Sequence, residues 1–94
     1  MAAYLIGQIN VKDNELWGQY VTGVQESLAP FAAKTIFRGE LIAVLAGNQD
    51  KDLVVVLEFS DQSILNDWFH SESYQALIPL RDKAADVVIS TYKP

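Results

Sequence analysis

Four segments of the chain are rich in branched and aromatic residues, the composition typical of β-strands. The six residues GNQDKD, from 47 to 52, separate the second and third of these segments and have the composition of a turn. The third segment, LVVVLEFS, carries the clearest strand signal in the chain. The predicted strands cover residue 2 or 3 to 11, then 35–46, 53–60 and 86–92.

Hydrophobic residues at helical spacing occupy the interval between the first two strands. Asp13 is a candidate N-cap, and apolar side chains then recur every three or four positions from Leu16 to Leu28. Pro30 disfavours the helical conformation for Ala29, so the sequence predicts that this helix ends there.

The interval between the third and fourth predicted strands contains more than one helical piece. Ser60 or Asp61 is placed to cap a short helix, and Ser71 to cap a second one after a break near His70. Pro79 cannot lie inside an unbroken helix, because it lacks an amide hydrogen and its ring clashes with the preceding turn. The sequence leaves open whether Pro79 kinks one helix or separates two.

The resulting order of elements is β-α-β-β-α-β. The chain has 94 residues, a length that suits a single domain covering residues 1–94. Two right-handed crossovers that share one sheet predict a ferredoxin-like α+β sandwich. We therefore expect a four-stranded antiparallel sheet with its helices on one face.

Strand alternation divides the sheet residues into two sets that face opposite sides. One set is almost entirely apolar and is expected to pack against the helices: Leu5, Gly7, Ile9, Val11, Leu53, Val55, Leu57, Phe59, Val87, Ile89 and Thr91. The other set would face away from them, yet it includes the apolar residues Tyr4, Ile6, Val54, Val56, Val88 and Tyr92. Because an apolar patch of this kind is usually covered, we predict a homodimer through this sheet face.

Charge and composition exclude several classes of protein. The net charge is −5, from twelve acidic and seven basic residues without a basic block, so a nucleic-acid partner is not expected. The absence of cysteine excludes disulfides, thiolate metal sites and a thiol nucleophile.

The apolar N-terminal run is broken by Gly7, Gln8 and Asn10, which predicts a strand rather than a signal peptide or membrane span. We expect a cytoplasmic protein without a membrane partner.

Arg38 and Glu58 are the first candidates for a functional site. They lie on neighbouring predicted strands, and they would meet if both side chains face the same side of the sheet. One interpretation is a structural ion pair, because buried charges must be paired. The other is a polar pocket in which Arg38 holds an anionic group and Glu58 transfers a proton.

The segment WFHSESYQALIPLR, residues 68–81, holds the second group of candidates. Tyr74 and Arg81 share a helical face, so Trp68 and Tyr74 are expected to pack on the sheet while Arg81 pairs with a carboxylate or an aromatic ring. His70, the only histidine, is a candidate general base, although a place at a helix end also suits it. Without a second histidine, a phosphate loop or a dinucleotide fingerprint, no cofactor or metal is expected, and a haem role for His70 ranks last.

Several short motifs, taken in their order along the chain, resemble a known family. They are the tyrosine-bearing first strand, Arg38-Gly39, Glu58-Phe59-Ser60, and WFHSESYQ followed by Arg81. It is domain-of-unknown-function family 1330, small bacterial proteins of the dimeric α+β barrel superfamily. The resemblance implies a ferredoxin-like fold and a homodimer, but no established activity. Its characteristic positions fall on Arg38, Gly39, Glu58, Phe59, Trp68, Ser71, Tyr74 and Arg81, whereas His70 falls on a variable one. Glu40 and Ala46 depart from the pattern, which usually has a glycine and an acidic residue there.

Two hypotheses for function follow. In the first, a cleft between sheet and helices binds a small anionic metabolite through Arg38 or Arg81, beside Trp68, Ser71 and Tyr74. Cofactor-independent acid–base or oxygenase chemistry through Glu58 or His70 would make that protein an enzyme. In the second, the protein is a structural or regulatory dimer without enzymatic activity, and its charged residues only stabilise the fold. The fold alone does not choose between them.

Overall fold

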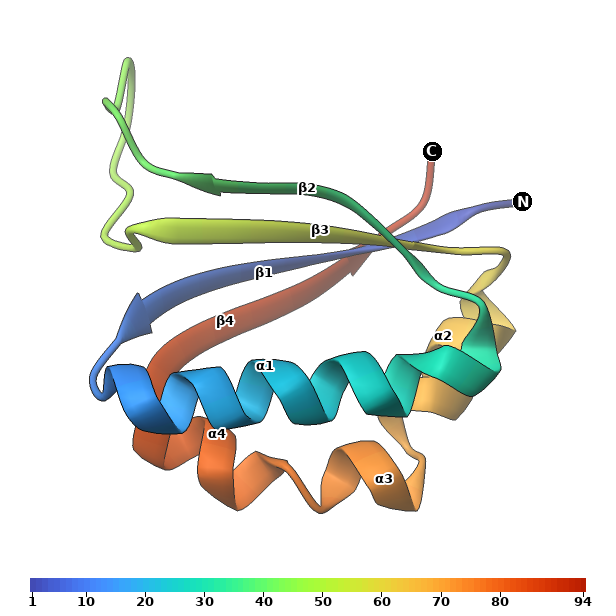
Figure 1. Ribbon diagram of the computed structural model, residues 1–94. Coiled ribbons are helices and arrows are strands. Elements are labelled where there is room, and N and C mark those ends of the chain that lie inside the picture. Colours follow the sequence, from blue (N-terminus) through green and yellow to red (C-terminus); the bar gives the residue numbers. More distant parts are fainter.

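A four-stranded antiparallel sheet carries every helix on one of its two faces (Figure 1). The computed structural model describes residues 1–94. The strand order is β2-β3-β1-β4, which confirms the predicted ferredoxin-like topology. In chain order the elements are β1 (Ala3–Val11), α1 (Asn14–Leu28), the 3₁₀ turn η1 (Ala29–Phe31), β2 (Lys34–Glu40), β3 (Leu53–Phe59), α2 (Gln62–Phe69), α3 (Glu72–Gln75), α4 (Ile78–Ala84) and β4 (Ala85–Tyr92).

Side-chain caps fix the starts of three helices where the sequence predicts them. The carboxylate of Asp13 accepts a hydrogen bond from the backbone amide of Leu16 at 3.0 Å, at the start of α1. Asp61, rather than Ser60, caps α2 at 2.8 Å, and Ser71 caps α3. Each cap satisfies a backbone N–H that has no partner within the helix.

Pro79 separates two helices rather than kinking one. Helix α3 ends at Gln75, and α4 begins at Ile78 with Pro79 in its first turn. A proline is compatible with that position because the first amides of a helix lack intrahelical acceptors. The predicted break near His70 is also present, since α2 ends at Phe69.

Strand β2 is shorter than the sequence predicts. It ends at Glu40, whereas the apolar pattern continues through Leu45 and predicted a strand to residue 46. Glu40 is opposite Leu53, the first residue of β3, so the residues after Glu40 have no strand to pair with. Residues 41–52, which we call the arm, instead form a loop that projects on the side of the sheet without helices (Figure 1).

A β-bulge in β2 determines which way its side chains point. Thr35 pairs with Leu57 and Phe37 pairs with Val56, so Ile36 is an extra residue without a partner. The alternation of side chains is therefore shifted after the bulge. As a result Arg38 is opposite Val55, which belongs to the set facing the helices.

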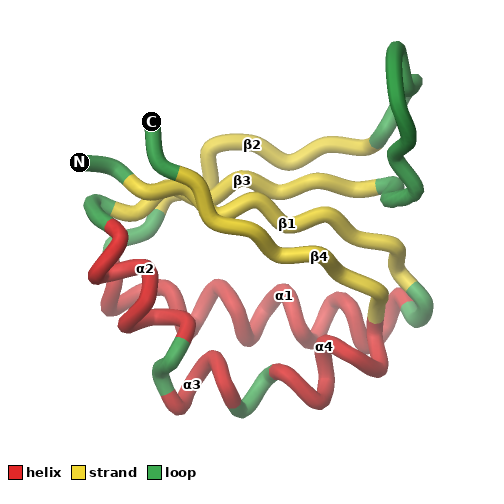
Figure 2. The backbone as a smooth tube through the Cα atoms, turned by 180° about the vertical axis from the view of Figure 1, so that it is seen from behind, coloured by secondary structure: helices red, strands yellow, loops and turns green.

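The two sheet faces differ as the alternation predicts. On the inner face, toward the helices, the buried core cluster consists of Ala3, Leu5, Tyr20, Leu28, Leu57, Phe59, Leu65, Trp68 and Tyr74. The outer face, opposite the helices, has no element of the chain over it (Figure 2). There Phe37, Val88 and Tyr92 remain 55%, 47% and 53% exposed. None of the helices has the length and apolar character that a membrane crossing requires.

Candidate functional site

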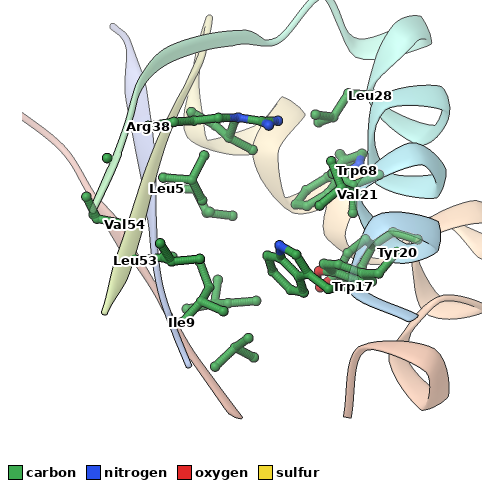
Figure 3. A pocket seen from close by; sticks show the side chains of 18 of the residues that line it. Leu5, Ile9, Trp17, Tyr20, Val21, Leu28, Arg38, Leu53, Val54 and Trp68 are labelled. Carbon is green, nitrogen blue, oxygen red and sulfur yellow. The ribbon is translucent and has the colours of Figure 1, made fainter. Parts of the chain in front are cut away.

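A cavity of about 390 Å³ lies between the inner face of the sheet and helix α1 (Figure 3). Its volume falls in the range of small-molecule sites, roughly 300–1,000 Å³. Of the 19 residues that line it, 15 are hydrophobic, so it favours an apolar ligand body. The apolar lining includes Leu5, Ile9, Leu53, Val55 and Leu57 from the strands, Trp17, Tyr20, Val21, Val24 and Leu28 from α1, and Trp68 and Tyr74.

Gly7 marks a tight contact between β1 and β3 in the sheet wall of this cavity. It lies in the middle of β1, in the set of residues that faces the helices, and it is part of the lining. A Cβ atom built on Gly7 would lie 3.0 Å from Cγ1 of Val55, so even a methyl group fits poorly there. The missing side chain therefore leaves room for Val55, the cross-strand partner of Gly7.

Arg38 is the only basic residue in the lining, and Glu40 is the only acidic one. Its side chain extends from β2 toward α1, across the edge of the cavity (Figure 3). The ion pairs of the protein are Lys12–Asp86, Lys51–Asp50 and Arg81–Asp82, and none of them involves Arg38. A guanidinium group that forms no ion pair, even with the Glu40 carboxylate in the same lining, therefore borders a mostly apolar cavity, an arrangement suited to an anionic ligand.

Two tyrosines and an arginine form a hydrogen-bonded chain at the helix side of the cavity. The hydroxyls of Tyr20 and Tyr74 share a hydrogen bond of 2.9 Å, and Nη1 of Arg81 donates to the Tyr74 hydroxyl at 3.2 Å. Burial, and then the neighbouring Tyr74, raises the pKa of Tyr20 far above its ordinary value. Arg81 also pairs with Asp82 at 3.1 Å, as the sequence predicts for a carboxylate partner. It does not line the cavity, so its contact with a ligand stays a prediction.

Trp68 and Tyr74 stand together in the cavity wall, with ring centroids 4.4 Å apart. The indole Nε1 of Trp68 donates to Oγ of Ser27 at 2.9 Å, which satisfies both buried groups. Ser71 is not part of the lining. Its Oγ caps α3 and donates to the carbonyl of Trp68 at 2.6 Å, a contact that joins the two helices around the tryptophan.

Glu58 lies on the outer face of the sheet, so the ion pair with Arg38 that the sequence allowed does not form. The bulge turns Arg38 inward, while Glu58 accepts a hydrogen bond of 2.9 Å from the hydroxyl of Tyr4. That hydrogen bond, with the charge of the Glu58 carboxylate, raises the pKa of Tyr4.

His70 also lies outside the cavity. It is exposed at the C-terminal end of α2, where its Nδ1 is 2.9 Å from the carbonyl oxygen of Asn66. The structure has no group of three or more His, Cys, Asp or Glu side chains close enough to hold a metal ion.

Trp17 and Tyr20 are cavity residues that the sequence did not single out. Their spacing placed them in the apolar stripe of the first helix, like any core residues. In the structure their rings stack with centroids 5.2 Å apart and border the cavity. The available signal was the pairing of two large aromatics on one helix face.

The family model for the domain of unknown function DUF1330 matches residues 2–92. The chain belongs to this family. The resemblance indicated by the ordered residues is therefore confirmed. Among curated proteins, none matches this DUF1330 chain.

Several solved structures share the fold of this DUF1330 protein at low sequence identity. A protein of unknown function from Rhodopseudomonas palustris is 16% identical, with a TM-score of 0.84 over 99% of this chain and 82% of that one. A dimeric ferredoxin-like protein of unknown function from Thermobifida fusca is 17% identical, with a TM-score of 0.65 over 100% and 92%. SnoaB, a cofactor-independent oxygenase from Streptomyces nogalater, is 6% identical, with a TM-score of 0.72 over 99% and 92%. These similarities establish the ferredoxin-like fold and no activity.

Proposed function

We propose that this protein binds a small carboxylic acid in the cavity between the sheet and α1. The observation that carries the proposal is the unpaired guanidinium of Arg38 at the edge of a mostly apolar cavity. A planar guanidinium binds a carboxylate through two parallel hydrogen bonds, which fixes the orientation of the ligand as well as adding affinity. The apolar lining then selects acids with a hydrophobic body over small polar ones.

The aromatic residues refine this ligand class. Trp17 and Trp68 both lie on the helix side of the cavity (Figure 3). Indole rings offer flat apolar surfaces, so a branched or aromatic body would bury more area there than a linear chain of the same size. The ligand that fits this description is a compact acid with its carboxylate on Arg38.

We further propose that the protein functions as a homodimer through the outer face of the sheet. Phe37, Val88 and Tyr92 are about half exposed on that face, although they are large and apolar. A domain of this size buries only a modest share of its surface and gains stability from a partner. The Thermobifida fusca protein with the same fold is dimeric, which supports self-association.

Proton transfer by Glu58 or His70 is not part of this proposal. Neither side chain lines the cavity, so neither is placed to act on an acid bound at Arg38. Catalysis by these two residues, with or without oxygen, stays a prediction from the sequence.

Thermal unfolding in the presence of small acids tests the binding proposal. The ligands are branched aliphatic and aromatic monocarboxylates, each compared with its uncharged amide. A ligand at a hundred times its dissociation constant stabilises the folded protein by about 2.7 kcal/mol, a readily measured rise in midpoint. Arg38→Gln is the test variant. Lys83→Gln, at an exposed position on α4, removes the same charge away from the cavity and is the matched control.

We expect at least one acid to raise the midpoint of the wild-type protein and of Lys83→Gln, but not of Arg38→Gln, while its amide has no effect on any of them. Equal shifts in both variants would show that Arg38 is not the anchor. No shift with any acid, together with early unfolding of Arg38→Gln alone, would instead favour the alternative of a structural or regulatory dimer.

A further inference from the structure

The two tryptophans of the cavity wall differ in what their indole nitrogens contact. Nε1 of Trp68 donates to Oγ of Ser27 at 2.9 Å. Nε1 of Trp17, which is half-buried, forms no hydrogen bond with any group of the protein. Indole N–H groups in the interior of a protein usually have a partner. The unpaired donor of Trp17 therefore indicates a partner that is not part of the chain.

This donor faces the cavity. In Figure 3 the indole nitrogen of Trp17 points into the open space between the sheet and the helix layer, on the side toward the guanidinium of Arg38. The indole ring is held there by stacking on Tyr20, with an angle of 28° between the two planes. No fully buried side-chain nitrogen or oxygen of the protein lacks a partner, so the Trp17 nitrogen keeps accessible surface. A molecule in the cavity can reach it.

The cavity itself offers no free acceptor to this N–H group. Of the 19 lining residues, only Tyr20, Tyr74 and Glu40 have side-chain oxygen atoms. The two tyrosine hydroxyls bond to each other at 2.9 Å, and Glu40 on β2 forms no hydrogen bond with Trp17. A ligand that fills the cavity displaces water from the indole nitrogen. It must then supply an acceptor of its own or leave the donor unpaired.

We propose that Trp17 donates a hydrogen bond to an oxygen atom in the body of the bound acid, apart from the carboxylate held by Arg38. This role of Trp17 rests on the proposed acid site and narrows its ligand to acids whose apolar body carries a carbonyl or ether oxygen. Arg38 then fixes one end of the ligand and Trp17 a second point. A site with a buried donor rejects an analogue that lacks the acceptor far more strongly than one of slightly different size. Trp17 is therefore a specificity-determining residue.

Pairs of acids with the same shape isolate the contribution of the oxygen. Phenoxyacetate has an ether oxygen where hydrocinnamate has a methylene group, and benzoylpropionate has a carbonyl where phenylbutyrate has a methylene group. By titration calorimetry, we expect the oxygen-bearing acid of at least one pair to bind at least about tenfold more tightly than its partner. Trp17→Phe keeps an aromatic ring and removes the donor. In this variant we expect the preference to fall below about twofold, while both acids of the pair still bind through Arg38.

The indole proton gives a second readout in the unaltered protein. The chain has two tryptophans, so nuclear magnetic resonance of a nitrogen-labelled sample shows two indole N–H signals. We expect the Trp17 signal to move downfield and to exchange more slowly with water when the oxygen-bearing acid is added, and to stay unprotected with its hydrocarbon partner. The Trp68 signal, whose proton is already bonded to Ser27, is the internal control and should exchange slowly throughout.

The outcomes separate the role of Trp17 from the acid site on which it rests. Equal affinities within both pairs, with an unshifted Trp17 signal, would overturn the role of Trp17 and leave the site at Arg38 intact. A preference that persists in Trp17→Phe would also overturn it, because another group would then be the donor. If none of these four acids binds, and no monocarboxylate shifts the thermal midpoint, the acid site itself is wrong and the role of Trp17 falls with it.

Discussion

Replacing Tyr74 with phenylalanine removes a single oxygen atom that holds two partners. The Tyr74 side chain is fully buried, and its hydroxyl bonds to Tyr20 at 2.9 Å and to Nη1 of Arg81 at 3.2 Å. In Tyr74→Phe the buried hydroxyl of Tyr20 is left without a partner, which costs about 1–3 kcal/mol. The lost bond to the charged Arg81 adds about 1 kcal/mol, at the low end because Arg81 keeps its contact with Asp82.

We therefore expect Tyr74→Phe to lower the free energy of unfolding by about 3 kcal/mol. Urea unfolding followed by tryptophan fluorescence measures this change at one fixed protein concentration, because dimerisation would make the midpoint concentration-dependent. With a slope of about 1.5 kcal/mol per molar urea, the midpoint falls by about 2 M. Thr91→Val, which removes an exposed hydroxyl on the other face of β4, is the control and is expected to change stability by less than about 0.5 kcal/mol.

The double variant tests the reasoning more sharply than the single one. Tyr20→Phe alone should cost only about 1 kcal/mol, because Tyr74 keeps its bond to Arg81. When both residues are phenylalanine, no orphaned hydroxyl remains, so adding Tyr20→Phe to Tyr74→Phe should restore about 1 kcal/mol. If the two losses simply add, or if Tyr20→Phe costs more than Tyr74→Phe, the Tyr74 hydroxyl does not hold Tyr20 and Arg81 together as the structure indicates.

Two further predictions concern alkaline pH and a helix cap. Because burial raises the pKa of Tyr20, the folded protein keeps a phenol proton that the unfolded chain loses near pH 10. The free energy of unfolding is therefore unaffected by this group below that pH, and it falls as the pH rises above it. Urea unfolding between about pH 9 and 11 should show a shallower fall for Tyr20→Phe than for the wild type, and equal slopes would contradict the burial of a protonated phenol. At the start of α2, Asp61→Ala removes the bond to the amide of Ile64 and should cost about 1 kcal/mol by urea unfolding, whereas Asp61→Asn keeps an acceptor and should cost less than half as much. Equal losses in the two variants would show that the capping oxygen contributes little.

The features that local chemistry controls were predictable from the sequence. The caps at Asp13 and Ser71 were expected because they depend on one side chain and the next three residues. The division of β1, β3 and β4 into an inner and an outer face followed from alternation alone. The contact between Tyr74 and Arg81 was consistent with their spacing, and it forms although they lie on separate helices.

The features that depend on pairing between distant segments were not predictable in the same way. The length of β2 depends on where β3 begins, and the apolar residues up to Leu45 resemble a strand although they have no partner. The direction of Arg38 depends on the extra residue at Ile36, which no local pattern reveals. The cavity itself is lined by strand residues on one side and by Trp17 and Tyr20 of α1 on the other, a relation that only the folded chain establishes.

The bulge at Ile36 also affects how molecules of this protein can aggregate. Strand β2 is an edge strand, and a regular edge offers evenly spaced backbone donors and acceptors to which a strand of another molecule can add without limit. The bulge interrupts that spacing in the middle of a seven-residue strand and twists the edge locally. The same irregularity that turns Arg38 toward the cavity thus protects this edge against open-ended fibril growth.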